Sequence, residues 1–478
     1  MKKKLNIFDL LVIAFGAMIG WGWVVSTGSW IKDGGVIGTV IGFFVAGLMI
    51  FFVGLVYSEL TTSIPVTGGE RVFSLRAFGP TVSFSCTWFL ILSYVGVVCF
   101  EAVSLPTILQ YIFPQIGDKV LYNIAGFDVS LYWLLISIGF SLLIGLINFI
   151  GIKKSAIVQK ILTIFIAVVG IVVMISAAAK GQADNISSQM FVSGSSSNGF
   201  GGVLKIICVA PFFLFGFDVI PQTAGEIKIP AKKIGTVMLV SIVMAVLFYV
   251  GIVLSVGSIF SSSEITTSLN GSGLVTADAM AKVFNSRGMA IFLIVGGLFG
   301  IITSWNSFLI GGSRALYSMS DANFLPRSFA KIHKKYNSPY LPVALITLIS
   351  IIAAFFGRTM LTWIVDSATF ACAIAYLIVS LSFIVLRKKE PELNRPFKIK
   401  HYKIVGVLAV VMCFAIIALY IIPNTGVTLV WQEWIIVGAW LVLGLIFYIV
   451  QKKKSGKKFG YSEEDIRLIS ESRKSYEN

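Results

Sequence analysis

The sequence carries little charge for its length and almost no histidine. Asp, Glu, Lys and Arg together make up 13% of the 478 residues, and there are two histidines. A water-soluble chain of this size needs more charged surface, whereas 57% of these residues are hydrophobic. We therefore expect an integral membrane protein.

Several chemical signatures are missing as well. The five cysteines show no paired spacing and fall within apolar stretches, so the sequence predicts neither a disulfide framework nor a metal site. Both histidines, His333 and His401, fall in predicted loops, and no GxxxxGK[ST] motif for ATP is present. We expect no catalytic residues and no cofactor, so an enzyme or an ATP-driven pump is disfavoured.

Long apolar runs recur along the chain with short polar connections between them. A helix of about 18 residues or more can cross a hydrocarbon core about 30 Å thick, and the runs lack the ten-residue alternation of barrel strands. The sequence predicts an all-α integral membrane protein with twelve transmembrane helices, at 9–31, 36–64, 83–113, 129–150, 156–178, 201–225, 236–260, 289–318, 340–357, 360–386, 402–422 and 431–450.

The net charge of +16 reflects where the basic residues lie. Most of the 38 Lys and Arg residues fall in the N-terminal segment 1–8, in alternate loops and in the tail 451–478. This distribution follows the positive-inside rule and predicts a multi-pass protein of the cell membrane with both termini cytoplasmic, not a nucleic-acid partner. We expect the basic tail to be solvated and largely disordered; binding of anionic lipid headgroups is the alternative.

Three glycines interrupt the first predicted span. In IAFGAMIGWGWVVSTG, Gly16, Gly20 and Gly22 lie within seven residues, although glycine in a helix interior costs about 1 kcal/mol relative to alanine. Close helix packing would explain the spacing of Gly16 and Gly20. A break in the helix, which exposes its backbone to a ligand, is the other explanation.

The sixth predicted span has the same peculiarity. In PFFLFGFDVIPQTAGE, Pro211, Gly216 and Pro221 interrupt one apolar run around Asp218. Breaks in the first and sixth spans are what an inverted repeat of five helices would produce, with 9–178 and 201–386 as the repeats and 402–450 as two further helices. The broken ends would meet near the bilayer midplane, where amide groups suit a carboxylate and carbonyl groups suit an ammonium.

The motifs around these breaks resemble those of the amino acid/polyamine/organocation transporter superfamily. The resemblance covers nearly the whole chain to about residue 450, and is carried by GAMIGWGW, YSELTTSIPVTGGERVFSLRAFG, GFDVIPQTAGEIKIPAKKI, GGSRALYSMSDANFLP and AYLIVSLSFIVLRKKEPELNRPFKI. It implies a LeuT-type fold and transport by alternating access. It also implies that a substrate carboxylate binds the amides of Gly20, Trp21 and Gly22, that its amino group binds carbonyls near Ala17, Met18, Phe212 and Phe215, and that Phe212 is an aromatic gate.

Two positions depart from the family pattern. Trp21 stands where many relatives have a small residue, so its side chain must point away from the ligand or reshape the pocket. Ile166 stands where some proton-coupled relatives have a lysine, so the resemblance does not support coupling through that lysine.

Two acids within the predicted spans stand out, Asp218 and Glu101, because charge there is costly and usually functional. Asp218 is near a position that is usually acidic in the family, which suggests gating or proton transfer. Three roles fit Glu101: contact with a cationic group of the substrate, transfer of the coupling proton, or a structural hydrogen bond. Trp305 and Asn306 on the eighth span are lesser candidates for lining the pocket.

These features predict a secondary active transporter of an amino acid or related amine, coupled to protons. A sodium symporter, an exchanger, a polyamine importer and a sensor that binds amino acids without moving them are the alternatives. The expected partners are a small-molecule substrate and the lipid bilayer. The sequence fits either a monomer or a homodimer.

Overall fold

The chain folds into a bundle of long helices. The computed structural model describes residues 6–150, 152–192, 200–224, 230–463 and 465. Within these residues, ten helical stretches have the length and apolar composition needed to cross a membrane, which confirms the expected all-α membrane class. All but the first are continuous helices: α4 (Val36–Ser63), α6 (Pro80–Ile112), α7 (Leu131–Ile150), α8 (Ile152–Lys180), α12 (Ala231–Ile259), α15 (Arg287–Asp321), α17 (Met360–Lys389), α18 (Tyr402–Ile421) and α19 (Trp431–Ser455).

The first stretch is divided into short helices. α1 (Ile7–Met18) begins at a capping box, in which the side chains of Asn6 and Asp9 each accept a hydrogen bond from the other residue's backbone N–H. After residues 19–21 come α2 (Gly22–Val25) and α3 (Thr27–Gly34). The first span is therefore broken beside Gly20 and Gly22, as the glycine pattern predicted.

The sixth predicted span is broken as well. α10 (Phe200–Phe213) is followed by turns at residues 214–218 and by α11, a single turn over Val219–Gln222. Gly216 has a φ of +133°, a conformation that glycine adopts far more readily than other residues. α10 and α16 (Tyr340–Ala354) are apolar but shorter than the ten long stretches.

Several short elements connect the long helices. A two-stranded antiparallel hairpin pairs β1 (Val120–Ile124) with β2 (Phe127–Ser130); Ala125 and Gly126 both have positive φ, as a tight hairpin turn requires. The sequence analysis did not predict this hairpin. The other short elements are α5 (Gly69–Phe78), η1 (Pro114–Gly117), α9 (Ala183–Ser188), α13 (Ser262–Asn270), α14 (Val275–Phe284), η3 (Arg327–Ala330) and η4 (Gly456–Lys458).

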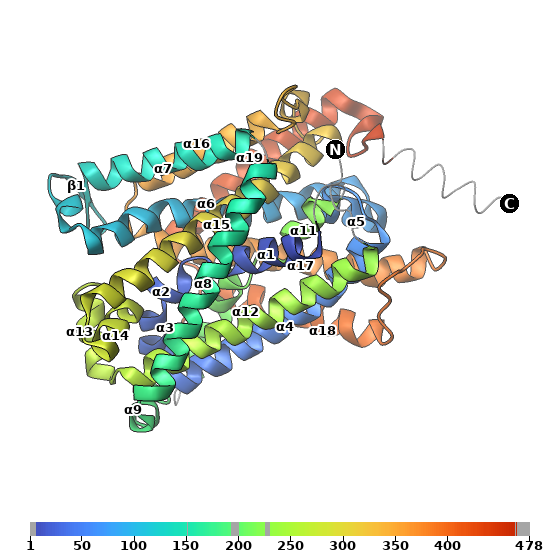
Figure 1. Cartoon of the computed structure of the whole chain (residues 1–478). Helices are drawn as coiled ribbons and strands as arrows, with labels where there is room; N and C mark the ends of the chain where they lie inside the picture. The colour runs from blue at the N-terminus through green and yellow to red at the C-terminus, as the bar shows by residue number, and fades with distance from the viewer. Residues whose placement is uncertain (1–5, 151, 193–199, 225–229, 464, 466–478) are drawn as a thin grey trace.

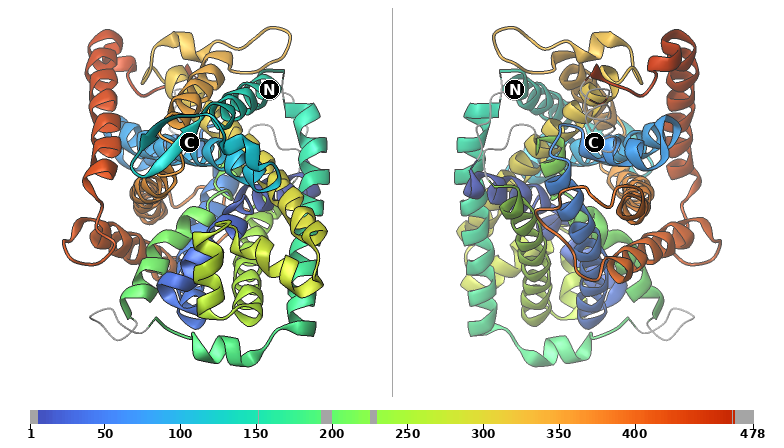
Figure 2. Two further views of the ribbon diagram at one scale, coloured as in Figure 1. Left: turned by 90° about the vertical axis from the view of Figure 1, so that its left-hand side faces the viewer. Right: turned by 90° about the vertical axis from the view of Figure 1, so that its right-hand side faces the viewer.

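The long helices surround the two broken ones. α4 lies along α12, α6 lies along α15 and α17, and α1 packs against α8, α12 and α15. In Figure 1 the β-hairpin, α13 and α14 lie at one end of the bundle, and α5 lies at the other. The turned views in Figure 2 show α19 at one edge of the molecule and α8 at the opposite edge. The breaks are thus enclosed by the middle of the bundle.

The described part of the C-terminal tail packs against the bundle. Arg71 of α5 donates two hydrogen bonds to Asp465, of 2.8 and 3.1 Å, and both side chains are 4% exposed. Phe459 is buried, with its ring centroid 5.0 Å from that of Phe324. The prediction of a solvated, largely disordered tail is wrong for residues 456–463 and 465, because a bidentate ion pair and aromatic contacts hold this segment.

Candidate functional site

The break in the first span leaves backbone N–H groups unused. The N–H of Ile19 donates to the carbonyl of Phe15 at 2.9 Å, which is the last hydrogen bond of α1. Within the described chain, Gly20, Trp21 and Gly22 donate no backbone hydrogen bond. These are the three amides to which the resemblance assigns a carboxylate. Buried N–H groups without a partner favour such an acceptor.

An acid lies directly beside this break. A Cβ atom added to Gly20 would be 2.5 Å from Oε1 of Glu101 on α6 and 3.1 Å from Oγ of Ser304 on α15. The Ser304 hydroxyl donates a hydrogen bond to the Glu101 carboxyl group. Glu101 is 2% exposed, and its Oε2 has no hydrogen-bond partner among the described residues. Backbone amides and a buried carboxyl group with a free oxygen therefore share one site.

The two breaks touch each other. A Cβ atom added to Gly216 would be 2.7 Å from Cβ of Ala17 and 3.0 Å from the backbone nitrogen of Met18. The carbonyl of Met18 accepts a hydrogen bond of 2.8 Å from the hydroxyl of Tyr249 on α12, and a carbonyl oxygen can accept a second one. The end of α1 and the turn after α10 therefore form one contiguous backbone surface.

Asp218 holds the turn of the second break in place. Its Oδ1 accepts a hydrogen bond of 3.0 Å from the N–H of Gly216, and its Oδ2 accepts one of 2.9 Å from the hydroxyl of Tyr376 on α17. Its own backbone carbonyl accepts one of 2.9 Å from the hydroxyl of Tyr94 on α6. Asp218 is fully buried. Both carboxylate oxygens are thus engaged within the protein.

Aromatic rings cover the site on the α10 side. The ring centroid of Phe212 is 5.2 Å from that of Phe100, which precedes Glu101 on α6, and 5.2 Å from that of Phe213. Phe215 contacts Tyr376 at 5.9 Å. Edge-to-face contacts at these distances are favourable. Phe212 therefore lies next to the acid-bearing turn of α6, where a gate over the site would be.

Trp21, the bulky residue at the first break, packs against Gly297 of α15. A Cβ atom added to Gly297 would be 2.1 Å from Cζ3 of Trp21, so the indole ring lies in the space that the missing side chain of Gly297 provides. Trp21 is fully buried, and its Nε1 has no hydrogen-bond partner among the described residues. The indole points toward α15.

Trp305 and Asn306, the two lesser candidates for lining the pocket, are buried side chains of α15. Trp305 is buried at 1% exposure. Asn306 accepts a hydrogen bond of 3.0 Å from Asn148 on α7 and donates one of 2.7 Å to Gln159 on α8. This polar cluster joins three helices inside the bundle. Ser304, which the sequence analysis did not single out, is a side chain of this helix that lies beside Gly20 of the first break.

Other contributors to the site also lacked a sequence signal. Tyr249, Tyr376 and Phe100 come from three separate helices, and they reach the breaks through hydroxyl or ring contacts. Their positions depend on how the helices rotate and tilt against each other. A single sequence does not contain that information, although Tyr376 falls within the quoted AYLIVSL motif.

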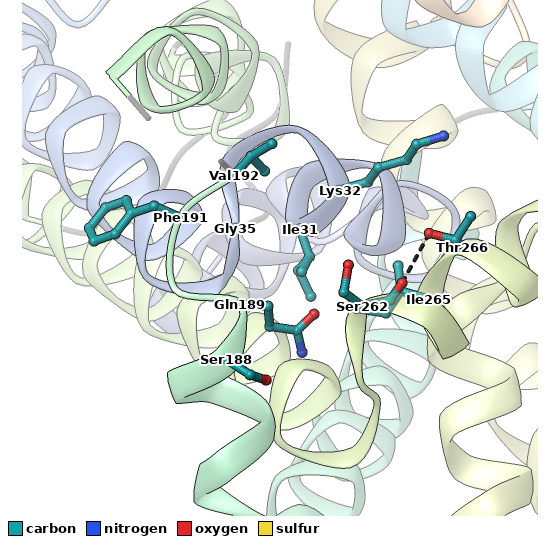
Figure 3. A pocket seen from close by; sticks show the side chains of 10 residues that line it. All are labelled: Ile31, Lys32, Gly35, Ser188, Gln189, Phe191, Val192, Ser262, Ile265 and Thr266. Carbon is teal, nitrogen blue, oxygen red and sulfur yellow. Dashed lines mark hydrogen bonds between the residues drawn. The ribbon is translucent and has the colours of Figure 1, made fainter. Parts of the chain in front are cut away.

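A separate cavity lies away from the breaks. The cavity has a volume of about 270 Å³ and is bordered by α3, α13 and the end of α9 with the segment after it; its polar side chains are those of Lys32, Ser188, Gln189, Ser262 and Thr266. These residues are drawn in Figure 3. The side-chain amide of Gln189 donates hydrogen bonds to the backbone carbonyls of Gly257 and Phe260, at the end of α12. None of the predicted site residues lines this cavity, so we do not assign it to the substrate.

Comparison with known proteins supports the resemblance seen in the motifs. The amino acid permease family profile matches residues 5–447. The branched-chain amino acid permease BcaP of Bacillus subtilis (strain 168) is 27% identical over 469 residues, which cover 96% of this chain and 94% of that protein. The histidine permease HisP of Lactococcus lactis subsp. cremoris (strain MG1363) is 24% identical over 482 residues, which cover 97% of each chain.

A further relative is named for its coupling ion. The aspartate-proton symporter of Bacillus subtilis (strain 168) is 25% identical over 464 residues, which cover 94% of this chain and 84% of that protein. The family profile covers the helical bundle from α1 to within α19. The chain therefore belongs to the amino acid permease family of membrane transporters, within the amino acid/polyamine/organocation superfamily.

Proposed function

We propose that this protein is a proton-coupled transporter that moves an amino acid or related amine across the cell membrane by alternating access. In this proposal the chain has twelve spans in a LeuT-type arrangement of five plus five helices and two more, with both termini cytoplasmic. The observation that carries it is the contact between the two broken helices, Gly216 against Ala17, with Glu101 at the same place.

The substrate would bind to the backbone of the breaks. Its carboxylate would accept hydrogen bonds from the amides of Gly20, Trp21 and Gly22, and its amino group would donate to carbonyls near Met18 and Phe215. Unused amides at a broken helix suit an anion without any positively charged side chain. Sites of this kind select the main-chain part of an amino acid and leave side-chain selection to the surrounding residues.

Glu101 would link the proton to the substrate. A carboxylate held at Gly20 lies beside the Glu101 carboxyl group, 2.5 Å from the Cβ position of that glycine. Two negative charges so close in a buried site repel strongly, so substrate binding favours the protonated form of Glu101. A protonated Glu101 can also donate a hydrogen bond to the substrate. Substrate and proton would then bind together and be released together.

The test is transport in liposomes. A thermal-shift screen against the amino acids and common polyamines identifies a ligand, because a compound that binds the folded state raises apparent stability. The purified protein in liposomes should then accumulate that ligand when the pH gradient is directed inward, and a protonophore should abolish the accumulation. Accumulation that requires a sodium gradient instead would contradict proton coupling.

Two further outcomes separate the remaining alternatives. Counterflow without accumulation under a pH gradient would identify an exchanger. Ligand stabilisation with neither counterflow nor accumulation would identify a sensor.

A further inference from the structure

We propose that Glu70 binds a proton and that this proton joins α5 to α11, the single turn that follows the break in the sixth span. Glu70 lies in the first turn of α5 and is fully buried. Its carboxyl oxygen Oε2 accepts a hydrogen bond from the side-chain amide of Gln222 on α11. Neither residue belongs to the site proposed for the substrate at Gly20 and Glu101.

Two glycines let the start of α5 approach α11 closely. A Cβ atom added to Gly69 would be 2.5 Å from Cβ of Pro221, which precedes Gln222 in the chain. Gly68, the residue before α5, has a φ of +87°, a conformation that glycine adopts far more readily than other residues. The backbone is therefore arranged so that the side chain of Glu70 meets that of Gln222.

Each of these two side chains has an oxygen without a partner. Oε1 of Glu70 and Oε1 of Gln222 are buried and have no hydrogen-bond partner among the described residues. While Glu70 is ionised, both oxygens are acceptors and neither can satisfy the other, and burying such atoms unpaired is costly. A protonated carboxyl group could donate to the amide oxygen while it accepts from the amide nitrogen. One proton on Glu70 would thus provide a partner for both oxygens.

No positively charged side chain pairs with Glu70 in the part of the chain that the structure describes. The titratable groups that face Glu70 are Tyr57 of α4, Cys86 and Tyr94 of α6, and Asp218 before α11. None of these groups is a cation. The adjacent Arg71 forms its ion pair with Asp465 of the tail instead. Burial and, to a lesser extent, the charge of Asp218 therefore raise the pKa of the Glu70 carboxyl group.

Glu59 of α4 shows, by contrast, how this chain holds a buried acid in its ionised form. Glu59 is 1% exposed. Its Oε2 accepts hydrogen bonds of 2.6 Å from the guanidinium group of Arg387 and 2.8 Å from the N–H of Ile399, and its Oε1 lies 3.1 Å from Nε of Arg395. Glu70 is as deeply buried but has no guanidinium partner. A buried carboxyl group without a counter-charge takes up a proton instead.

The proton can leave when this end of the bundle opens. α5 lies at the end opposite the β-hairpin (Figure 1), which is the cytoplasmic end in the proposed topology. The partial positive charge at the start of α5 favours a carboxylate, and water supplies its other partners once α11 moves away. Loss of the proton removes the bond to the Gln222 oxygen, so proton release and opening accompany each other. This role in transport rests on the proposed function, whereas the bound proton does not.

The experiment is infrared spectroscopy of the full-length protein in lipid nanodiscs at about pH 7. The carbonyl stretch of protonated carboxyl groups is recorded for the wild type, Glu70→Gln and the control Asp118→Asn, an exposed acid after η1. We expect Glu70→Gln to lose the intensity of one carboxyl group from this band and Asp118→Asn to lose none. A band of wild-type intensity in Glu70→Gln would overturn the proposal.

A variant that keeps the acid covers the case in which Glu70→Gln does not fold. Gln222→Leu removes the amide and leaves Glu70 in place. A protonated carboxyl group that loses a hydrogen bond absorbs at a higher frequency, so we expect one component of the band to shift upward. A band unchanged in position and intensity would show that the proton is not held between Glu70 and Gln222. Neither measurement involves transport, so failure of this proposal is distinguishable from failure of the proposed function.

Discussion

Oε1 of Glu101 lies 2.5 Å from the position that a Cβ atom of Gly20 would occupy. A carboxyl group on α6 thus fills the space that the glycine of the first break leaves open. This contact explains why glycine is required there, because any side chain at position 20 would displace either Glu101 or Ser304. It also places the acid next to the amides that are proposed to bind the substrate.

The first prediction concerns Gly20→Ala. The added methyl group must push Glu101 or Ser304 away, and overpacking of this kind costs about 1–3 kcal/mol. We expect substrate binding, measured by ligand-induced thermal stabilisation, to weaken by about tenfold or more. Gly139→Ala is the matched control, since a Cβ atom on this exposed glycine of α7 meets nothing within 4 Å. Equal binding by the two variants would remove the first break from the substrate site.

The second prediction concerns Glu101→Gln, which keeps the shape of the side chain and removes its exchangeable proton. We expect counterflow of a neutral substrate to persist, because the amide can still hydrogen-bond to a carboxylate. Accumulation driven by a pH gradient should fall to the level of protein-free liposomes.

The other two roles of Glu101 predict different patterns in the same variant. A far greater loss of binding for cationic than for neutral substrates would make Glu101 the partner of a substrate cation. Equal loss of counterflow and accumulation for all substrates would leave Glu101 a structural role.

The sequence predicted the long helices because each depends on local composition. The predicted span 402–422 corresponds to α18 (Tyr402–Ile421), and 36–64 corresponds to α4 (Val36–Ser63). Both breaks were predicted as well, since glycine and proline act on the backbone where they stand. The hairpin over residues 120–130 was missed because its strands are short, and α13 and α14 were missed because polar loop helices carry no apolar run.

The arrangement of the site was less predictable. Glu101 stood out as an acid within an apolar run, but its contact with Gly20 depends on the rotation of α6 against α1. The space for Trp21 is created by Gly297, which is 276 residues away in the chain. Asp465 lies in a tail rich in charged residues, a composition typical of solvated segments. Its ion pair with Arg71 depends on where the tail meets α5.

The third prediction concerns the second break. Gly216 has a φ of +133°, and a Cβ atom there would be 3.0 Å from the backbone nitrogen of Met18. Gly216→Ala combines an unfavourable backbone conformation with a clash against the first break, so we expect it to destabilise the fold by about 2 kcal/mol or more. Thermal unfolding measures the loss. Gly438→Ala on α19, where a Cβ atom meets nothing within 4 Å, should unfold close to the wild-type temperature.

The fourth prediction concerns the ion pair of the tail. Burial opposes ionisation of Asp465, but Arg71 and the hydrogen bonds from Arg71 and Ser462 outweigh burial and hold the pKa of this carboxyl group below its usual value. The pair therefore stabilises the fold above the unfolded pKa of about 3.9. That stabilisation is lost as the pH falls through the lower folded pKa.

Asp465→Asn should therefore lower the melting temperature at pH 7. Removing one partner of a buried pair costs about 3 kcal/mol or more, and the difference from the wild type should shrink below about pH 4. Glu463→Gln, an exposed acid two residues earlier, is the control and should melt like the wild type. A difference from the wild type that stays constant with pH would mean that the charge of Asp465 does not matter.

The last prediction concerns Asp218, the other acid proposed to take part in coupling. Its two carboxylate oxygens accept hydrogen bonds from the N–H of Gly216 and the hydroxyl of Tyr376. An amide in its place can keep both contacts in weaker form, because hydrogen bonds to a charged acceptor are stronger than those to a neutral one. We expect Asp218→Asn to lose about 1–2 kcal/mol of stability and to reduce counterflow and proton-driven accumulation together, since the turn that it holds serves both. If proton-driven accumulation disappears while counterflow stays at the wild-type rate, the carboxyl group of Asp218 carries the proton. Proton coupling would then depend on both Asp218 and Glu101.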